Sequence, residues 1–258
     1  MLALGLKATL LGSTMGLPVA GDEEEPPPGP VTPSLVGTPT FHISPTTSEN
    51  SPRDISHTST TGNVLVRMLG RTNSGTTITM AGTWNGVAMT QLCLGQPSPA
   101  AASQSFLWGA IIRGGATGAN TLAITKNTSA GRYVVRIDDI ADLPADFLGA
   151  TPVVTRAVGA VNSLAASLTP EGAESLMLTW GGVVVMADSA HPIGVAGDWD
   201  LDGVMNGDAV PDTSVHSRGA FGSRVGGDAA AQITSTLTAS GAQTSTTFTT
   251  AIVELLAG

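Results

Sequence analysis

A series of short segments between Thr58 and Ile137 alternates apolar and polar residues, and this pattern limits the possible folds more than any other feature of the 258-residue chain. Alternation with a period of two is typical of β-strands that bury one face. The segments are Gly62–Gly70, Thr76–Ala81, Asn85–Thr90, Ser105–Arg113, Asn120–Thr125 and Arg132–Ile137. Turn-forming residues between the segments or at their ends include Asn73–Gly75, Asn85–Gly86, Gly114–Gly115 and Gly118. Such residues favour tight turns, so we predict short antiparallel connections.

Strand-like segments also occur outside this block. They are Thr40–Ile43, Val153–Val161, Leu164–Leu168 and Leu176–Met186. A two-sheet, jelly-roll-like sandwich is the simplest way to bury so many half-apolar strands. We therefore predict an all-β domain over residues 40–258, with few helical residues and with Ser44–Thr61 as a polar connection.

Several of these segments resemble a β-sandwich family of structural proteins from tailed bacteriophages and related virus-like particles. The similar segments are Gly62–Val66, Asn85–Thr90, Phe106–Trp108, Thr117–Thr125, Glu174–Gly182 and Thr246–Leu256. In that family the pattern reads GNLLV, YNGVALT, IWYL and GTHTVTVT, followed by a returning GDLVV strand. The resemblance implies an antiparallel sandwich, a virion location and other capsid or tail proteins as partners. None of the similar motifs is a catalytic signature.

Composition points in the same direction. Only 12% of the residues are charged, and the chain contains 32 Gly. Sparse charge is common where sheet faces are covered by neighbouring subunits, which suggests a homo-oligomer. The net charge of −9, from 11 basic and 20 acidic residues, argues against a nucleic-acid surface. The single Cys93 excludes an intrachain disulfide, and we expect it to be a small buried side chain.

The first 39 residues differ from the rest and suggest a tether. Residues 1–20 are apolar but interrupted by glycine, proline and Lys7, which argues against both a signal peptide and a membrane span. Residues 20–39 are rich in proline and should form an extended spacer. We predict an extended N-terminal anchor that binds a partner protein through its leucines. These are Leu2, Leu4, Leu6, Leu10, Leu11 and Leu17.

One acidic segment resembles the first half of a calcium-binding loop. Asp198, Asp200 and Asp202 alternate and are followed by Gly203, as in loops whose oxygens surround one ion. The twelfth position is Ala209 rather than glutamate, so the second half departs from the EF-hand pattern. The candidate ligands are Asp198, Asp200, Asp202, Asn206 and Asp208. The alternative is a surface loop without metal. A second acidic segment, Asp138–Asp146, fits no metal loop and is expected to be a solvated corner.

No catalytic constellation is evident in the sequence. His42, His57, His191 and His216 lack metal-ligand spacing to one another, and we expect them in surface or loop positions. No nucleophile elbow, P-loop or paired-cysteine motif occurs, so we predict a protein that is not an enzyme.

Two functions then fit the sequence. The first is a virion structural protein, such as a capsid decoration, spike or tail component held by its N-terminal segment. The alternative is a carbohydrate-binding or host-adhesion module that binds a surface glycan. Tryptophans distinguish the two, because a glycan-binding module needs an exposed aromatic ring. Trp108 and Trp180 lie in strand alternation and should be buried, whereas Trp199 lies in the acidic segment and could stack on a sugar.

Overall fold

The computed structural model describes residues 29–44, 53–72, 77–97, 104–127, 133–159, 161–185, 193–206, 216–226, 231–239 and 247–258. These residues form seventeen β-strands in four sheets. Every strand pairing within them is antiparallel. The described part contains no helix, and therefore none that could cross a membrane. The predicted all-β antiparallel sandwich is confirmed.

The first half of the chain forms a sandwich of two sheets, which we call the N-terminal sandwich. Its inner sheet contains, in spatial order, β1 (Ser34–Ile43), β9 (Tyr133–Ala141), β3 (Val64–Thr72), β7 (Gln104–Ile112) and β6 (Thr90–Gly95). Its outer sheet contains β2 (Arg53–Ser59), β8 (Gly118–Lys126), β4 (Met80–Trp84) and β5 (Val87–Ala88).

The second half forms a C-terminal sandwich. Its inner sheet contains β10 (Val153–Val158), β17 (Thr247–Leu255), β12 (Leu176–Val185), β15 (His216–Val225) and β14 (Asp200–Asn206). Its outer sheet contains β11 (Ser163–Leu168), β16 (Ile233–Ala239) and β13 (Ile193–Ala196). The sequence predicted a sandwich of two sheets, and the described residues instead build two such sandwiches.

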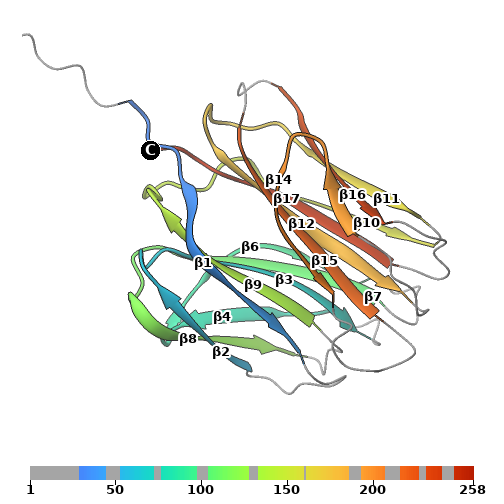
Figure 1. Ribbon diagram of the computed structural model, residues 1–258, viewed down its shortest axis with the longest axis horizontal. Coiled ribbons are helices and arrows are strands. Elements are labelled where there is room, and N and C mark those ends of the chain that lie inside the picture. Colours follow the sequence, from blue (N-terminus) through green and yellow to red (C-terminus); the bar gives the residue numbers. More distant parts are fainter. Residues whose placement is uncertain are drawn as a thin grey trace, which may run out of the picture.

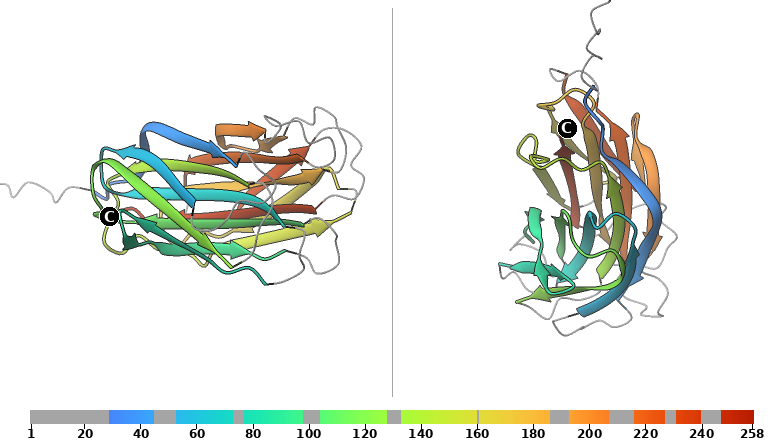
Figure 2. Two further views of the ribbon diagram at one scale, coloured as in Figure 1. Left: turned by 90° about the horizontal axis from the view of Figure 1, so that it is seen from below. Right: turned by 90° about the vertical axis from the view of Figure 1, so that its left-hand side faces the viewer.

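The two sandwiches have the same strand order. The inner order β1-β9-β3-β7-β6 is repeated as β10-β17-β12-β15-β14, and the outer order β2-β8-β4 is repeated as β11-β16-β13. The inner sheets pack back to back with β3 against β12, while β7 contacts β17 and the corresponding β15 contacts β9. This reciprocal contact is the arrangement of an isologous dimer, here within one chain. Figures 1 and 2 show the resulting stack.

The stacking explains why the inner strands are apolar on both faces. In β3, Val64, Val66 and Met68 face the outer N-terminal sheet, whereas Leu65 and Leu69 face the C-terminal sandwich. Both sets are fully buried. A strand covered on both sides loses the alternation of apolar and polar residues that marks a half-exposed strand. A third buried cluster lies between the two C-terminal sheets.

The N-terminal boundary of the fold lies earlier than predicted. β1 begins at Ser34 and pairs with β9, so residues 34–39 belong to a sheet rather than to the proline-rich spacer. Pro39 is accommodated because the register of β1 shifts between Val36 and Thr40 on an edge strand. Val31 and Gly258 exchange two backbone hydrogen bonds, which places the C-terminus beside the start of β1 (Figure 1). The proposed anchoring leucines lie outside the described residues.

Candidate functional site

Two groups of buried polar side chains stand out in the described structure. The first lies between the two inner sheets. The Arg67 guanidinium donates to the carboxylate of Asp138 at 2.8 Å and to that of Asp202 at 2.9 Å. Arg136 donates to both carboxylate oxygens of Asp138, at 2.8 and 2.9 Å. Two arginines and two aspartates therefore balance one another across the boundary between the sandwiches.

Burial and charge act in opposite directions in this ionic network. Burial alone would lower the pKa of Arg67, but the charges of Asp138 and Asp202 outweigh it and raise that pKa. Burial would raise the pKa of Asp138, but Arg67 and Arg136 lower it. Both groups are therefore ionised at neutral pH. A buried ion pair of this kind adds little net stability, because the cost of removing its charges from water offsets their attraction.

The ionic network uses one of the predicted calcium ligands. Asp202 lies in strand β14 rather than in a loop, and its carboxylate accepts hydrogen bonds from Arg67 and from Ser223 at 2.9 and 2.6 Å. Asp198 and Asp200 are exposed, while the Asn206 side chain and Asp208 lie outside the described part. Within the described residues, no group of three or more His, Cys, Asp or Glu side chains could hold a metal ion. Calcium binding by this segment stays a prediction.

The second acidic segment is also different from the prediction. Asp138 and Asp139 are buried, on opposite faces of β9, so they do not form part of a solvated corner. Only the later residues Asp142 and Asp146 are exposed. Two consecutive carboxylates can both be buried here because each faces a different set of hydrogen-bond donors.

Trp199 is buried rather than available to a sugar. It is 8% exposed, its indole N–H donates to the carbonyl of Thr234 at 3.1 Å, and Arg224 lies over its ring. Trp108 and Trp180 are buried as predicted, and Trp84 is buried as well. The four tryptophans of the chain are thus all core residues.

Cys93 behaves as expected for a small buried side chain. It lies in β6 and contributes to the cluster between the inner sheets. Burial raises the pKa of its thiol to about 12, so the thiolate is not populated at neutral pH.

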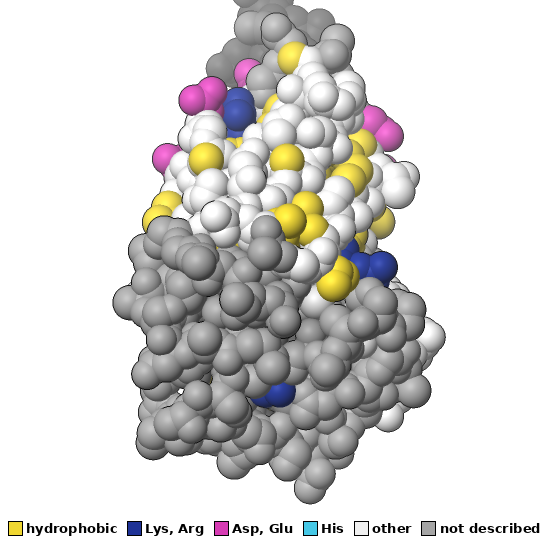
Figure 3. All heavy atoms as spheres, turned by 90° about the vertical axis from the view of Figure 1, so that its right-hand side faces the viewer, with side chains coloured by type: hydrophobic (Ala, Val, Ile, Leu, Met, Phe, Trp, Pro, Cys, Tyr) yellow, Lys and Arg dark blue, Asp and Glu magenta, His cyan; other side chains and the backbone are white. Residues whose placement is uncertain are grey.

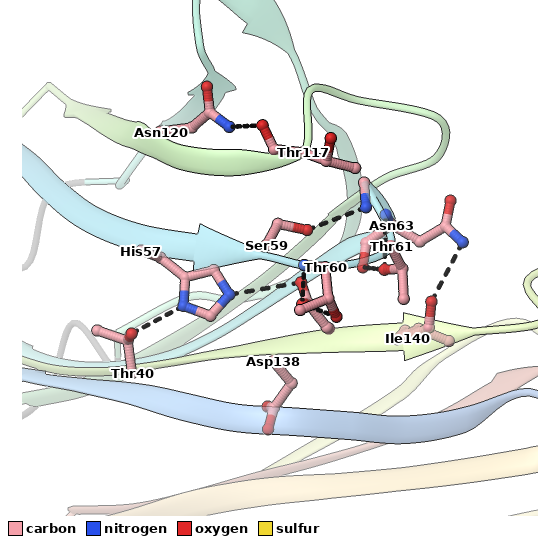
Figure 4. Close-up of polar contacts among 12 residues, drawn as sticks. Thr40, His57, Ser59, Thr60, Thr61, Asn63, Thr117, Asn120, Asp138 and Ile140 are labelled. Atoms are coloured by element: carbon pink, nitrogen blue, oxygen red, sulfur yellow. Dashed lines mark hydrogen bonds and ion pairs between the residues drawn. The ribbon is translucent and has the colours of Figure 1, made fainter.

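The second polar group is centred on His57, and here the sequence prediction was wrong. His57 was expected in a surface or loop position, but it is 4% exposed and lies in strand β2, within the segment interpreted as a polar connection. Nδ1 of His57 lies 2.7 Å from Oγ1 of Thr40 in β1. Nε2 lies 3.4 Å from Oδ1 of Asp139 in β9. Figure 4 shows the imidazole contacting Thr40 on one side, with Asp138 directed away from it.

Asp139 is itself held in place. Its second carboxylate oxygen accepts hydrogen bonds from the backbone N–H of Thr60 at 2.6 Å and from the Thr60 hydroxyl at 2.9 Å. Burial would raise the pKa of Asp139, but the bonds from the Thr60 amide and from Ser59, Thr60 and His57 outweigh it and lower that pKa. The carboxylate is therefore ionised and fixed.

The His57 group borders a hollow in the surface. The hollow has a volume of about 440 Å³ and is lined by residues 37–40 of β1 on one side and by His57, Thr58 and Thr60 on the other. Behind the imidazole, the Trp84 ring lies 5.9 Å away and closes the inner side. Thr40 and His57 both line the hollow, and Asp139 of β9 contacts the imidazole through the ring nitrogen that does not face Thr40.

Sequence reasoning missed this group because its members are far apart in the chain. One signal was available: Ile55, His57 and Ser59 alternate with polar residues, which marks them as one inward face of a strand. That pattern could have identified His57 as buried. It could not have identified Thr40 or Asp139 as its partners.

Comparison with known proteins adds no further information about these groups. No protein-family model, curated protein or solved structure matches the chain.

Proposed function

We propose that this chain is a structural protein of a bacteriophage virion, displayed on the particle as a capsid decoration, spike or tail component, and that it associates with itself and with other virion proteins. The observation that carries this proposal is the position of the exposed apolar side chains. Five of them, each between 39% and 58% exposed, lie on the edge strands of the sheets. They are Phe41 of β1, Val87 of β5, Val158 of β10, and Leu201 and Val204 of β14.

Edge strands with exposed apolar side chains are surfaces for association, because they also present unpaired backbone groups. β1 and β14 are the edges of the two inner sheets, and the Phe41 ring lies over Gly203 of β14. The two edges therefore present Phe41, Leu201 and Val204 on one side of the stack. A partner that covers this side would contact both sandwiches.

The distribution of charge also supports assembly. In Figure 3, the described part of the face carries scattered hydrophobic side chains, and its charged side chains lie toward the margins. The outward side chains of β16 include Thr234 and Thr238, and those of β11 include Ser163 and Ala165. A chain with a net charge of −9 can approach its own copies most easily through such uncharged surfaces.

The same structure does not favour the carbohydrate-binding alternative. That function required an exposed tryptophan or tyrosine, and the four tryptophans and Tyr133 are all buried. The structural role is therefore the better supported of the two.

Self-association can be tested with the full chain by size-exclusion chromatography with light scattering. We expect an oligomer, and we expect the double variant Leu201→Ser/Val204→Ser to raise its dissociation constant at least about tenfold, equivalent to roughly 1.4 kcal/mol. Val225→Ser is the matched control, because Val225 is also exposed but lies on β15, which is not an edge strand. A chain that stays monomeric at all concentrations would contradict self-association.

The anchor can be tested separately on purified particles. Deletion of residues 1–28 removes Leu2 through Leu17 but spares Val31 and β1, so the sandwiches should stay folded. We expect the truncated protein to be absent from particles while the full chain is detected there by mass spectrometry. Incorporation of the truncated protein at full occupancy would place the attachment in the sandwiches instead.

A further inference from the structure

We propose that Thr40, His57 and Asp139 form a catalytic group that hydrolyses small uncharged esters, with Thr40 as nucleophile, His57 as general base and Asp139 as a positioning residue. This activity is separate from the structural role proposed above and does not depend on it. A hydroxyl, an imidazole and a carboxylate in hydrogen-bonded sequence are the recurring requirements of an activated oxygen nucleophile.

The hydrogen bonds determine which nitrogen of His57 carries the proton. An ionised carboxylate can only accept, so Asp139 Oδ1 places the ring proton on Nε2. Nδ1 then presents a lone pair to the Thr40 hydroxyl at 2.7 Å. This is the form of the imidazole that can remove a proton from Thr40. In serine proteases Nε2 faces the nucleophile and Nδ1 faces the carboxylate, so the two nitrogens have opposite roles here. Such a catalytic triad is recognised by the geometry of its three groups rather than by which ring nitrogen faces which partner.

The C-terminal sandwich shows that the fold does not require the hydroxyl and the imidazole of this group. Counted from the end of the second strand, the position of His57 in β2 is occupied by Ala166 in β11. The strand register gives the other correspondences. Thr40 pairs with Ile137, which lies two residues before Asp139, and Val153 pairs with Ile252, which lies two residues before Glu254. Val153 therefore corresponds to Thr40, and Glu254 corresponds to Asp139. Val153 and Ala166 belong to an apolar cluster.

The same edge can therefore be closed without a hydroxyl and an imidazole, while the buried carboxylate is kept there as Glu254. Burying an imidazole is unfavourable unless it is hydrogen-bonded. An imidazole where the corresponding position holds an alanine points to a role other than packing.

The hollow supplies access for the substrate and a site for the developing oxyanion. The side chains that line it carry no permanent charge, and its volume of about 440 Å³ suits a small neutral substrate. The register of β1 and β9 passes from Val36 directly to Thr40, so Gly37 and Thr38 lie outside the β1–β9 pairing. Gly37 and Thr38 both line the hollow, and their backbone N–H groups are the donors that we assign to the carbonyl oxygen of the substrate.

The proposed reaction has two stages. Thr40 Oγ1 attacks the ester carbonyl carbon as its proton passes to Nδ1 of His57, and the bond to the alcohol then breaks as the alcohol oxygen takes that proton. An acyl ester on Thr40 remains. Water then attacks this ester, giving one proton to Nδ1, and Thr40 recovers its proton as the carboxylic acid leaves. Asp139 stays ionised throughout and keeps the ring oriented.

The test uses the full chain with p-nitrophenyl acetate as substrate and a fluorophosphonate as covalent probe. We expect hydrolysis that follows Michaelis–Menten kinetics and a probe adduct located on Thr40 by peptide mass spectrometry. Thr40→Ala should lower kcat roughly 100-fold or more, because general-base activation of a nucleophile contributes about 10² to 10⁴. Thr40→Ser should keep the adduct and the hydrolysis.

Two further variants separate catalysis from structure. Thr155→Ala in β10 is the matched control, because Thr155 is a threonine in the corresponding first strand of the other sandwich; its kcat should equal that of the parent. Asp139→Asn should lower kcat with KM unchanged, since an amide can donate to Nε2 and move the ring proton to Nδ1. Hydrolysis that persists in Thr40→Ala, or a folded parent chain that forms no adduct on Thr40, would overturn the proposal.

Discussion

The N-terminal and C-terminal sandwiches have the same strand order, but different side chains fill the contact between their first and second strands. In the N-terminal sandwich, β1 and β2 are joined by Thr40, His57 and Asp139. In the C-terminal sandwich, the corresponding strands β10 and β11 meet over an apolar cluster that includes Val153 and Ala166. The same strand order is thus compatible with a polar contact or an apolar contact between these two strands. A comparison of the two sandwiches separates what the fold needs from what one sandwich has in addition.

Other features occur in both sandwiches and can be assigned to the fold. Asp139 of β9 caps the connection between β2 and β3 by accepting from Thr60. Glu254 of β17, the corresponding last strand, caps the connection between β11 and β12 by accepting from the backbone N–H groups of Glu171 and Gly172. A carboxylate near the end of the last strand therefore holds the same connection in each sandwich. The imidazole is the part that is not repeated.

The largest effect is expected at the boundary between the sandwiches. Arg67→Ala leaves Asp138 and Asp202 without their main cation in a buried site, which should lower the free energy of unfolding by about 3 to 5 kcal/mol. Chemical denaturation followed by tryptophan fluorescence measures this. Arg156→Ala is the control, because Arg156 also joins the sandwiches, through the carbonyl of Gln96, but is exposed. Equal effects of the two variants would mean that burial of the network is unimportant.

A smaller loss is expected at the cap of the C-terminal sandwich. The Glu254 carboxylate accepts from the N–H groups of Ala150, Glu171 and Gly172 and from the hydroxyl of Ser175. Glu254→Ala leaves these donors without their acceptor and should cost about 2 to 3 kcal/mol, since each buried unsatisfied group costs roughly 1 to 3 kcal/mol and water can reach some of them.

The matched control for the Glu254 cap is Glu171→Ala. The Glu171 side chain is exposed, and its backbone N–H, which makes the bond, is retained. We expect a change within about 0.5 kcal/mol. A loss from Glu171→Ala as large as that from Glu254→Ala would contradict the role given to the buried carboxylate.

The two caps also predict a common dependence on pH. Burial would raise the pKa of Glu254, but bonds from Glu171, Ser175, Ala150 and Gly172 outweigh it and lower that pKa. The pKa of Asp139 is lowered in the same way. A carboxylate whose pKa is lower in the folded than in the unfolded chain adds stability above its unfolded pKa, near 4, and this stability is lost as the pH falls toward the folded pKa.

Thermal unfolding should therefore shift to lower temperature below about pH 4. The measurement is a series of melting curves from pH 7 to pH 2, on the parent and on Glu254→Gln. The variant should begin from a lower melting temperature at neutral pH and lose less on acidification. A parallel pair of curves would show that Glu254 does not contribute through its charge.

The all-β fold class was predictable from turn residues and the alternation of apolar and polar residues, whereas the number of sheets was not. Turn residues and alternation identify many of the strands, and Trp108 and Trp180 lie in the core as their alternation indicates. The division into two sandwiches depends on which faces of β3 and β12 are covered. A strand that is apolar on both faces has the same sequence pattern in a single sandwich and in two stacked sandwiches.

The polar groups were predicted least well because each depends on long-range register. Asp202 was grouped with Asp198 and Asp200 by spacing, but it binds Arg67, which lies 135 residues away in sequence. His57 and Asp139 are 82 residues apart. Local spacing carries no information about such pairs, since the strand order of a sheet decides which side chains meet.

Among the variants that alter buried polar groups, the smallest stability effect should come from one that makes the N-terminal sandwich resemble the C-terminal one. The double variant Thr40→Val/His57→Leu replaces the hydroxyl and the imidazole by apolar side chains of similar shape. Replacing both partners of a hydrogen bond in this way can be nearly neutral, and Asp139 keeps its two bonds from Thr60. We therefore expect a change in the free energy of unfolding within about 1 kcal/mol. Asp139→Ala is the contrasting variant, because it removes the cap that both sandwiches share and should cost more. If the double variant instead loses more than Asp139→Ala, the imidazole is needed to close this edge, and the apolar closure of the C-terminal sandwich is not a valid guide to the N-terminal one.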